Sequence, residues 1–222
     1  PVSSSGHLFL FHKILGVKQD INLDIFLHFS SLFVIFVFFR KEILKILKGF
    51  FSLKKENEDF KMAIYILSGT IITCLIGFLL KDKDFLENKN IVSLGFLITT
   101  ILLFFSDKKG ERKVDLKSSL IIGFSQGIAL IPGVSRSGAT ISTAKILGIN
   151  NQDSFNFSFL LAIPAITGAL ILKINEIKNI KLDYMICAFL VSFFTGMITL
   201  FLLKKILMKR KIKYFFIYTF II

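Results

Sequence analysis

The sequence has few of the residues that usually mark disulfides, turns or membrane interfaces. Tryptophan is absent, and only four tyrosines, three prolines and two cysteines occur in 222 residues. Cys74 and Cys187 lie singly inside apolar segments, which argues against a disulfide or a metal site, and we expect both to be small packing residues. Because Trp and Tyr normally form the aromatic belts of membrane proteins, any interfaces are poorly marked here.

What the chain has in excess is apolar surface and positive charge. Hydrophobic residues make up 54% of it, phenylalanine contributes 27 residues, and the mean hydropathy is +0.71. This composition is too apolar for an ordinary soluble domain, and we expect one membrane domain over 1–222. The net charge of +13 does not indicate a nucleic-acid partner, because Lys and Arg fall in short clusters between apolar runs.

Several apolar runs are candidates for crossing a hydrocarbon core of about 30 Å. The run at 91–105 is short, so either its ends extend or the bilayer thins locally. A last run at 214–222, YFFIYTFII, is about half a span, and we expect the chain to stop within a helix there. The full candidate spans are 23–39, 62–80, 91–105, 155–172 and 184–203.

Three connections between these runs are rich in Lys and Arg, namely 40–61, 106–117 and 204–213. The positive-inside rule predicts that such connections of a multi-pass protein lie in the cytoplasm. We interpret their charges as signals that orient the protein and not as a binding site.

Two apolar segments, 1–17 and 118–149, are interrupted by clusters of Pro, Gly and Ser and do not resemble spans. We call these clusters the first break (Pro1–His7, PVSSSGH) and the second break (Pro132–Thr140, PGVSRSGAT). The loop charges predict that 118–149 enters from the cytoplasmic side, whereas 1–17 dips in from outside. The two breaks are therefore expected to approach each other from opposite faces of the membrane.

This arrangement predicts an all-α, polytopic transmembrane helix bundle built from two inverted-topology repeats. The repeats are about 1–105 and 118–222, and each contains a re-entrant broken helix. The shared letters KILG at 13–16 and 145–148 close the two hairpins and support the repeat.

The residue types in the breaks suit an anion-binding site. Pro and Gly interrupt a helix, and the half-helix that follows begins with unpaired N–H groups and a partial positive charge. The hydroxyls add further donors, although they could instead only cap the half-helices. These hydroxyl residues are Ser3, Ser4, Ser5, Ser135, Ser137 and Thr140.

Arg136 in the second break is the strongest single indication of phosphate binding. A buried arginine at membrane depth is costly unless it is paired or hydrated, and its fixed donors suit a phosphate bidentately. The alternative is an internal pair with a carboxylate, for which Asp24 is the one candidate. His7 would face the same gap and could move a proton, whereas we interpret His12 and His28 as structural or interfacial.

Gln126 lies on the half-helix that precedes the second break, two turns from Arg136 by count. A buried glutamine needs hydrogen-bond partners. We expect it to orient a phosphate oxygen, a water or a metal-bound group.

At these residues the sequence resembles the bacterial undecaprenyl-diphosphate phosphatase family, of the type that confers bacitracin resistance. The first break resembles the end of the first family motif, and the second break matches the second motif almost letter for letter. Two further stretches are similar to the helices around the second motif, and the resemblance covers essentially the whole chain. These stretches are GFSQGIAL at 123–130 and FSFLLAIP at 157–164.

The resemblance implies an enzyme that hydrolyses undecaprenyl diphosphate, a C55 isoprenyl diphosphate, to undecaprenyl phosphate and phosphate. This reaction would recycle the lipid carrier of cell-wall synthesis in the bacterial plasma (inner) membrane, with the active site open to the outer face. It also implies a divalent cation, Mg²⁺ or Ca²⁺. A homodimer is one open arrangement, and no nucleic acid is expected.

The family motifs assign roles by position. Ser4 matches the nucleophile, His7 the catalytic histidine and Arg136 the phosphate-binding arginine. The family also carries an acidic pair just before its first motif, and we expect it to precede Pro1 here, so that metal ligands are unassigned and the chain as given could be inactive. The remaining substrate-binding candidates are Ser3, Ser5, Gln126, Gly133, Ser135, Ser137 and Thr140.

Two questions stay open at this point. Ser4 could attack the phosphate with His7 or a missing Glu as base, or His7 could activate water with Ser4 as a ligand only. Inverted repeats with broken helices also describe a prenyl-phosphate flippase or a secondary transporter of an anionic substrate, which needs neither nucleophile nor base. A structural membrane subunit is a third reading, and the intramembrane Arg136 argues against it.

Overall fold

The computed structural model describes residues 1–16, 21–54, 56–80, 89–173 and 182–222. In this part of the chain the regular structure is helical, and the one β-type contact is an isolated bridge between Arg112 and Ile149. The elements are α1 (Ser4–Leu15), α2 (Ile21–Phe38), α3 (Arg40–Phe51), α4 (Glu58–Leu79), α5 (Lys89–Phe104), α6 (Leu116–Ile128), α7 (Arg136–Ile146), α8 (Asn151–Lys173), α9 (Leu182–Met208), a short 3₁₀ turn η2 (Ile212–Tyr214) and α10 (Phe215–Ile221).

Three of the predicted spans form helices long and apolar enough to cross a membrane, namely Glu58–Leu79, Asn151–Leu172 and Ile186–Met208. The predicted spans at 23–39 and 91–105 form shorter apolar helices in the described residues, over Phe26–Phe38 and Lys89–Phe104. The all-α membrane bundle expected from the sequence is thus confirmed. The two-fold relation between repeats 1–105 and 118–222 stays a prediction.

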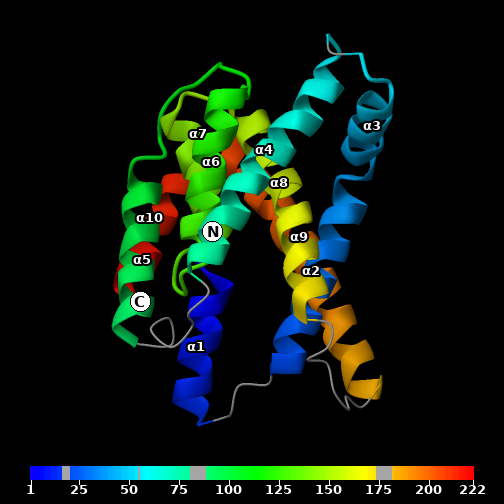
Figure 1. The fold of residues 1–222 in the computed structure, drawn as a ribbon. Coiled ribbons are helices and arrows are strands. Elements are labelled where there is room, and N and C mark those ends of the chain that lie inside the picture. Colours follow the sequence, from blue (N-terminus) through cyan, green and yellow to red (C-terminus); the bar gives the residue numbers. More distant parts are fainter. Residues whose placement is uncertain (17–20, 55, 81–88, 174–181) are drawn as a thin grey trace.

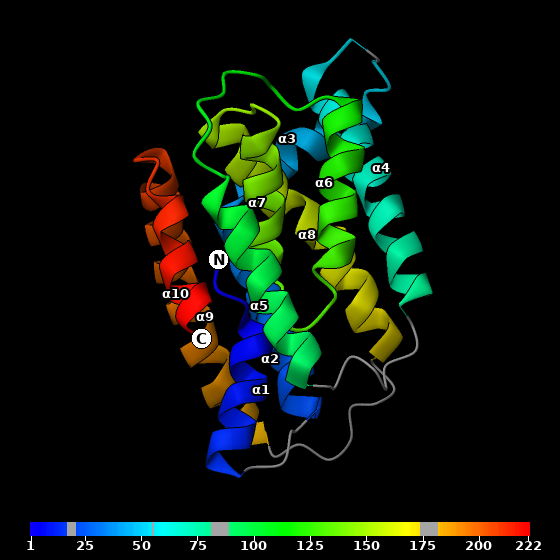
Figure 2. The ribbon, with the colours of Figure 1, turned by 90° about the vertical axis from the view of Figure 1, so that its left-hand side faces the viewer.

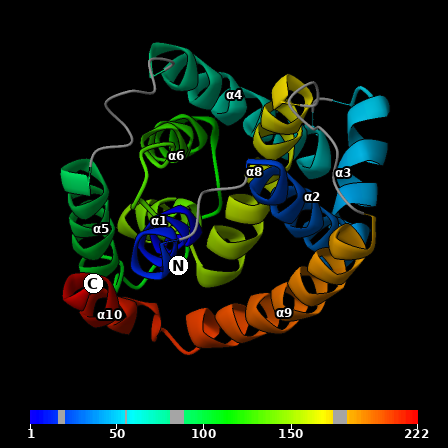
Figure 3. The same cartoon turned by 90° about the horizontal axis from the view of Figure 1, so that it is seen from below.

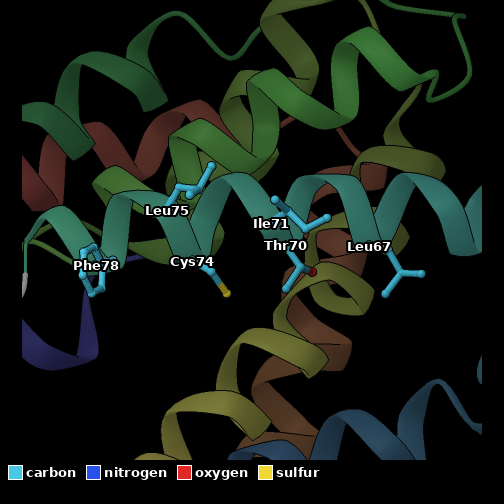
Figure 4. A pocket seen from close by; sticks show the side chains of 6 residues that line it. All are labelled: Leu67, Thr70, Ile71, Cys74, Leu75 and Phe78. Carbon is cyan, nitrogen blue, oxygen red and sulfur yellow. The ribbon is translucent and has the colours of Figure 1, made fainter.

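The outer surface of the bundle is apolar, as a membrane protein requires. Phe78, Leu172 and Phe201 are more than half exposed, and a contiguous surface of this kind would drive aggregation in water. An open apolar groove runs along the outer side of α4 (Figure 4). Cys74 lies in this groove and Cys187 is also exposed, and both are free thiols on the outside of the bundle.

The interior is organised around aromatic side chains from helices that are distant in sequence. Phe39 after α2, Phe155 in α8 and Leu207 in α9 are fully buried in one cluster. A second cluster places Ile122 of α6 against Leu161 of α8. These two clusters fix α6 and α8 relative to the outer helices, and with them the second break.

The three basic connections lie at the same end of the bundle, as two ion pairs between them show. Lys113 in the second connection forms an ion pair with Glu58, in the first, at 2.8 Å. Asp107 in the second connection forms an ion pair with Lys213, in the third. This shared end agrees with the orientation that the loop charges predict.

Two of these connections are more ordered than expected. Residues 40–51 form α3, whose Ile43 and Ile46 pack against the core while Lys41, Lys45 and Lys48 are exposed. Their spacing matches an amphipathic helix, which the count of charges alone concealed. The third connection is short, because α9 continues to Met208 before η2 begins.

Helix α1 and the α6–α7 pair occupy opposite halves of the molecule. α1 extends from the level of the N-terminus toward the end away from the basic connections, whereas α6 and α7 form a hairpin in the other half (Figures 1 and 2). Seen from below, α1 lies within the ring that α4, α5, α10, α9 and α2 make around the centre (Figure 3). The two breaks are therefore brought together inside the bundle.

Candidate functional site

The second break is a tight turn between α6 and α7 that packs against α5. Gly133 has φ +91°, and a Cβ atom added to it would lie 2.1 Å from the carbonyl oxygen of Val92. Glycine is therefore required at this position for both its conformation and its close approach. The structure thus gives Gly133 a role in the backbone, and its role in substrate binding stays a prediction.

Thr99 of α5 ties this turn together. Its hydroxyl accepts a hydrogen bond from the backbone N–H of Ser135 at 2.9 Å and lies 3.2 Å from the carbonyl oxygen of Gly133, to which it can donate. Ser135 in turn caps α7, since its Oγ accepts from the N–H of Gly138 at 3.1 Å. Capping, one of the two roles considered for these hydroxyls, is thus what Ser135 does in the structure.

The first break has a similar cap at the start of α1. Ser3 is buried, and its Oγ accepts from the N–H of Gly6 at 3.2 Å and lies 3.3 Å from Oγ of Ser5. Its φ of +64° is unusual for a residue other than glycine, and such backbone strain is concentrated at functional sites. Ser4 and Ser5 are exposed at the beginning of the helix.

His7 is held by two hydrogen bonds and two rings. Its Nδ1 lies 2.7 Å from the carbonyl oxygen of Ser3, and its Nε2 lies 2.7 Å from the hydroxyl of Tyr218 in α10. The ring stacks on Tyr218 and makes an edge contact with Phe96. Both ring nitrogens therefore have partners other than Ser4, the proposed nucleophile.

The two breaks are in contact. A Cβ atom on Gly6 would lie 3.1 Å from Cα of Gly133, and one on Gly138 would lie 3.3 Å from the carbonyl oxygen of Pro1. His7 follows Gly6 directly, and Arg136 lies between Gly133 and Gly138 in sequence. The structure thus brings the imidazole and guanidinium residues into neighbouring segments, as the sequence predicted.

Arg136 is the first residue of α7 and is partly exposed. Within the described residues its guanidinium has neither a hydrogen-bond nor an ion-pair partner, while its backbone carbonyl accepts from Thr140. The side chain of Asp24, the carboxylate considered as an internal partner, lies outside the described part of the structure. Neither α1 nor α7 carries an acidic residue in its first turn, so both helix ends favour an anion.

Two predicted site residues are engaged elsewhere. The Thr140 hydroxyl lies 2.5 Å from Oγ of Ser158 in α8. Gln126 is buried between α4 and α8, where its Nε2 donates to Thr73 at 3.2 Å and to the carbonyl oxygen of Leu161 at 3.4 Å. Its Oε1 is buried and has no hydrogen-bond partner among the described residues. Ser137, next to Arg136, is partly exposed.

The described residues do not fit a divalent-cation site. Mg²⁺ and Ca²⁺ prefer carboxylate oxygens, and no group of three or more His, Cys, Asp or Glu that could hold a metal occurs in the described part of the chain. The breaks contribute hydroxyl, imidazole and guanidinium groups instead, which is a set of ligands for an anion.

Sequence reasoning missed three residues that build the site, namely Phe96, Thr99 and Tyr218. Phe96 and Thr99 lie in the run at 91–105, whose sequence indicates only an ordinary apolar span. Tyr218 is 211 positions from His7, and the only signal for it is that a scarce tyrosine lies in the last apolar run.

The fold and the site define the chain as an all-α membrane protein in which the starts of two helices, α1 and α7, meet inside the bundle. The comparison with known families then identifies it: residues 1–222 match the family described as Bacitracin resistance protein BacA, and the chain belongs to that family.

Relatives from distant organisms agree with this assignment. An undecaprenyl-diphosphatase of Thermosipho africanus is 39% identical, and the match covers 100% of this chain and 90% of the relative. An undecaprenyl-diphosphatase of Korarchaeum cryptofilum is 36% identical with the same coverage. Undecaprenyl-diphosphatase 2 of Bacillus thuringiensis is 34% identical over 100% of this chain and 88% of the relative.

Proposed function

We propose that the chain is an integral membrane phosphatase that hydrolyses undecaprenyl diphosphate to undecaprenyl phosphate and phosphate, recycling the lipid carrier of cell-wall synthesis. The observation that carries this proposal is Arg136, a guanidinium without a protein partner among the described residues, at the start of α7 and beside the first break. Membership of the family supports the same activity.

The terminal phosphate is bound by Arg136 and by the free N–H groups at the start of α7. Stabilising negative charge on the transferring phosphoryl group is the main task in this chemistry. The guanidinium offers two parallel N–H donors to two phosphate oxygens. The prenyl tail lies among the apolar outer side chains or in the lipid. The protein therefore binds the diphosphate group, while the apolar tail stays in an apolar environment.

Ser4 attacks the terminal phosphorus, and its proton passes to His7 or to an upstream carboxylate. The bond to the bridging oxygen breaks, undecaprenyl phosphate leaves, and water hydrolyses the phosphoserine. The alternative is that His7 activates water directly. Mass spectrometry of the quenched reaction separates the two, because a phosphoryl group on Ser4 appears only in the first.

The cellular setting of the reaction is part of the proposal. The protein lies in the bacterial plasma membrane with 40–61, 106–117 and 204–213 in the cytoplasm, which opens the site to the outer face. A Mg²⁺ or Ca²⁺ cofactor is supported by the family resemblance alone, because the described residues do not fit such a site; assays with and without a chelator test it. A homodimer is tested by the mass of the detergent-solubilised protein.

The test is phosphate release from undecaprenyl diphosphate by the purified full-length protein in detergent. Ser4→Ala, His7→Ala and Arg136→Ala are each expected to lower kcat/KM by about 100-fold or more, the usual effect of removing one such group. Arg112→Ala is the control, since this exposed arginine pairs with Asp115 at the basic end. Release that persists in all three variants would reject the site, whereas a wild-type protein that releases no phosphate would favour a flippase or transporter.

A further inference from the structure

His7 has only one nitrogen that can accept a proton in the geometry observed. A carbonyl oxygen accepts hydrogen bonds only, so the 2.7 Å contact with Ser3 requires the proton of the neutral ring on Nδ1. The lone pair then lies on Nε2, 2.7 Å from the hydroxyl of Tyr218, which must donate to it. Tyr218 therefore occupies the basic nitrogen of the proposed catalytic histidine.

Tyr218 is held in place by the same helix that supports both breaks. Its neighbour Thr219 is buried and accepts a hydrogen bond from Thr100 of α5 at 2.8 Å. Phe216 makes an edge contact with Phe104 at the other end of this interface. Because α5 also provides Phe96 and Thr99, it fixes the position of Tyr218 relative to His7 and the second break.

We propose that Tyr218 is the positioning residue of His7, and this inference rests on the proposed phosphatase activity. The stacked ring, 2° from parallel, and the hydroxyl together hold the imidazole in one orientation and one tautomer. A phenol can donate to a neutral imidazole and accept from an imidazolium. A proton that reaches Nε2 from Ser4 or water must displace the Tyr218 O–H from this lone pair; the hydroxyl then turns, keeps its own proton, and its oxygen accepts from the imidazolium N–H.

The first experiment compares two Tyr→Phe changes in the same segment of the full-length protein. Tyr218→Phe keeps the ring and removes only the hydroxyl, and we expect kcat to fall about tenfold or more while KM changes less than about twofold. Tyr214→Phe is the matched control, because the Tyr214 ring lies beside Lys213 and its hydroxyl has no hydrogen-bond partner in the described residues. Equal rates for Tyr218→Phe and wild type, or equal losses in both variants, would overturn the inference.

A second readout follows the hydrogen bond itself and needs no substrate. In protein labelled with ¹⁵N-histidine, the His7 signals are assigned by their loss in His7→Gln. Tyr218→Phe should move the Nε2 signal of His7 toward that of an imidazole nitrogen without a hydrogen bond, with the His12 and His28 signals unchanged. An unchanged His7 signal would refute the positioning role. If the wild type releases no phosphate, the proposed function fails, and this measurement still decides whether Tyr218 holds His7.

Discussion

The first and second breaks contain similar residues, but the structure holds them in different ways. In the second break the backbone is buried against α5, and Gly133, Val134 and Ser135 are all inaccessible. In the first break Ser4 and Ser5 are exposed, and His7 is held by groups from distant parts of the chain. The second break is thus a rigid support for Arg136. The first break carries Ser4 and His7, the groups proposed to attack the phosphorus and to accept a proton.

The largest effect is expected from filling the closest contact of the second break. Gly133→Ala adds a Cβ atom 2.1 Å from the Val92 carbonyl oxygen, at a φ that also disfavours alanine. We expect destabilisation of about 3 kcal/mol or more, since backbone must move to admit the methyl group. Thermal unfolding of the purified protein in detergent measures it.

Gly16→Ala is the matched control for that change. Gly16 ends α1 with φ +64°, and a Cβ atom there would meet nothing within 4 Å in the part of the chain that the structure describes. The strain of the left-handed conformation alone should cost about 1–2 kcal/mol. Equal losses for the two variants would show that conformation, and not close packing on α5, is what the second break requires.

The sequence predicted the location of this rigid support but not how it is held. The letters PGVSRSGAT mark a helix break because Pro and Gly have local backbone effects, and local effects can be predicted from local sequence. Thr99 and Tyr218 act through contacts between segments that are distant in sequence, so no periodicity or motif predicts their roles. α3 was missed for another reason: its lysines dominate the composition and conceal the apolar face of a helix.

A smaller effect is expected from removing the hydroxyl that links α5 to the second break. Thr99→Val keeps the side-chain shape but leaves the buried N–H of Ser135 without its 2.9 Å acceptor. An unpaired buried donor costs about 1–3 kcal/mol. We also expect phosphate release to fall, because Ser135 directly precedes Arg136. Thermal stability and kcat of the same variant are the two measurements.

Thr199→Val gives the comparison for this change. Thr199 is exposed on α9, and among the described residues its hydroxyl bonds only within its own helix, to the carbonyl oxygens of Thr195 at 2.8 Å and Gly196 at 3.1 Å. We expect a change within about 0.5 kcal/mol and no loss of activity. A Thr99→Val protein as stable and active as Thr199→Val would contradict the view that α5 supports the second break.

The smallest effect concerns a helix start outside the membrane, where the α6–α7 hairpin begins. Asp115 caps α6 by accepting from the Ser118 N–H at 2.8 Å, and the Ser118 hydroxyl oxygen accepts from the Asp115 backbone N–H at 2.9 Å. Hydrogen bonding by Ser118, through its side chain and then its backbone, lowers the pKa of Asp115 below its ordinary 3.8. Asp115→Ala should therefore cost about 1 kcal/mol near neutral pH, as for other lost caps.

This contribution has a definite pH dependence. Because the pKa of Asp115 is lower in the folded state than in the unfolded state, its stabilisation is complete above the unfolded value of about 3.8. It is lost as the pH falls through the lower, folded value. Melting temperatures of wild type and Asp115→Ala should thus differ by a constant amount from pH 7 to about 5 and converge below about pH 4. A difference that persists in acid would mean that the neutral carboxyl group caps α6 equally well, so that charge at the entrance of the hairpin contributes nothing to the support of the second break.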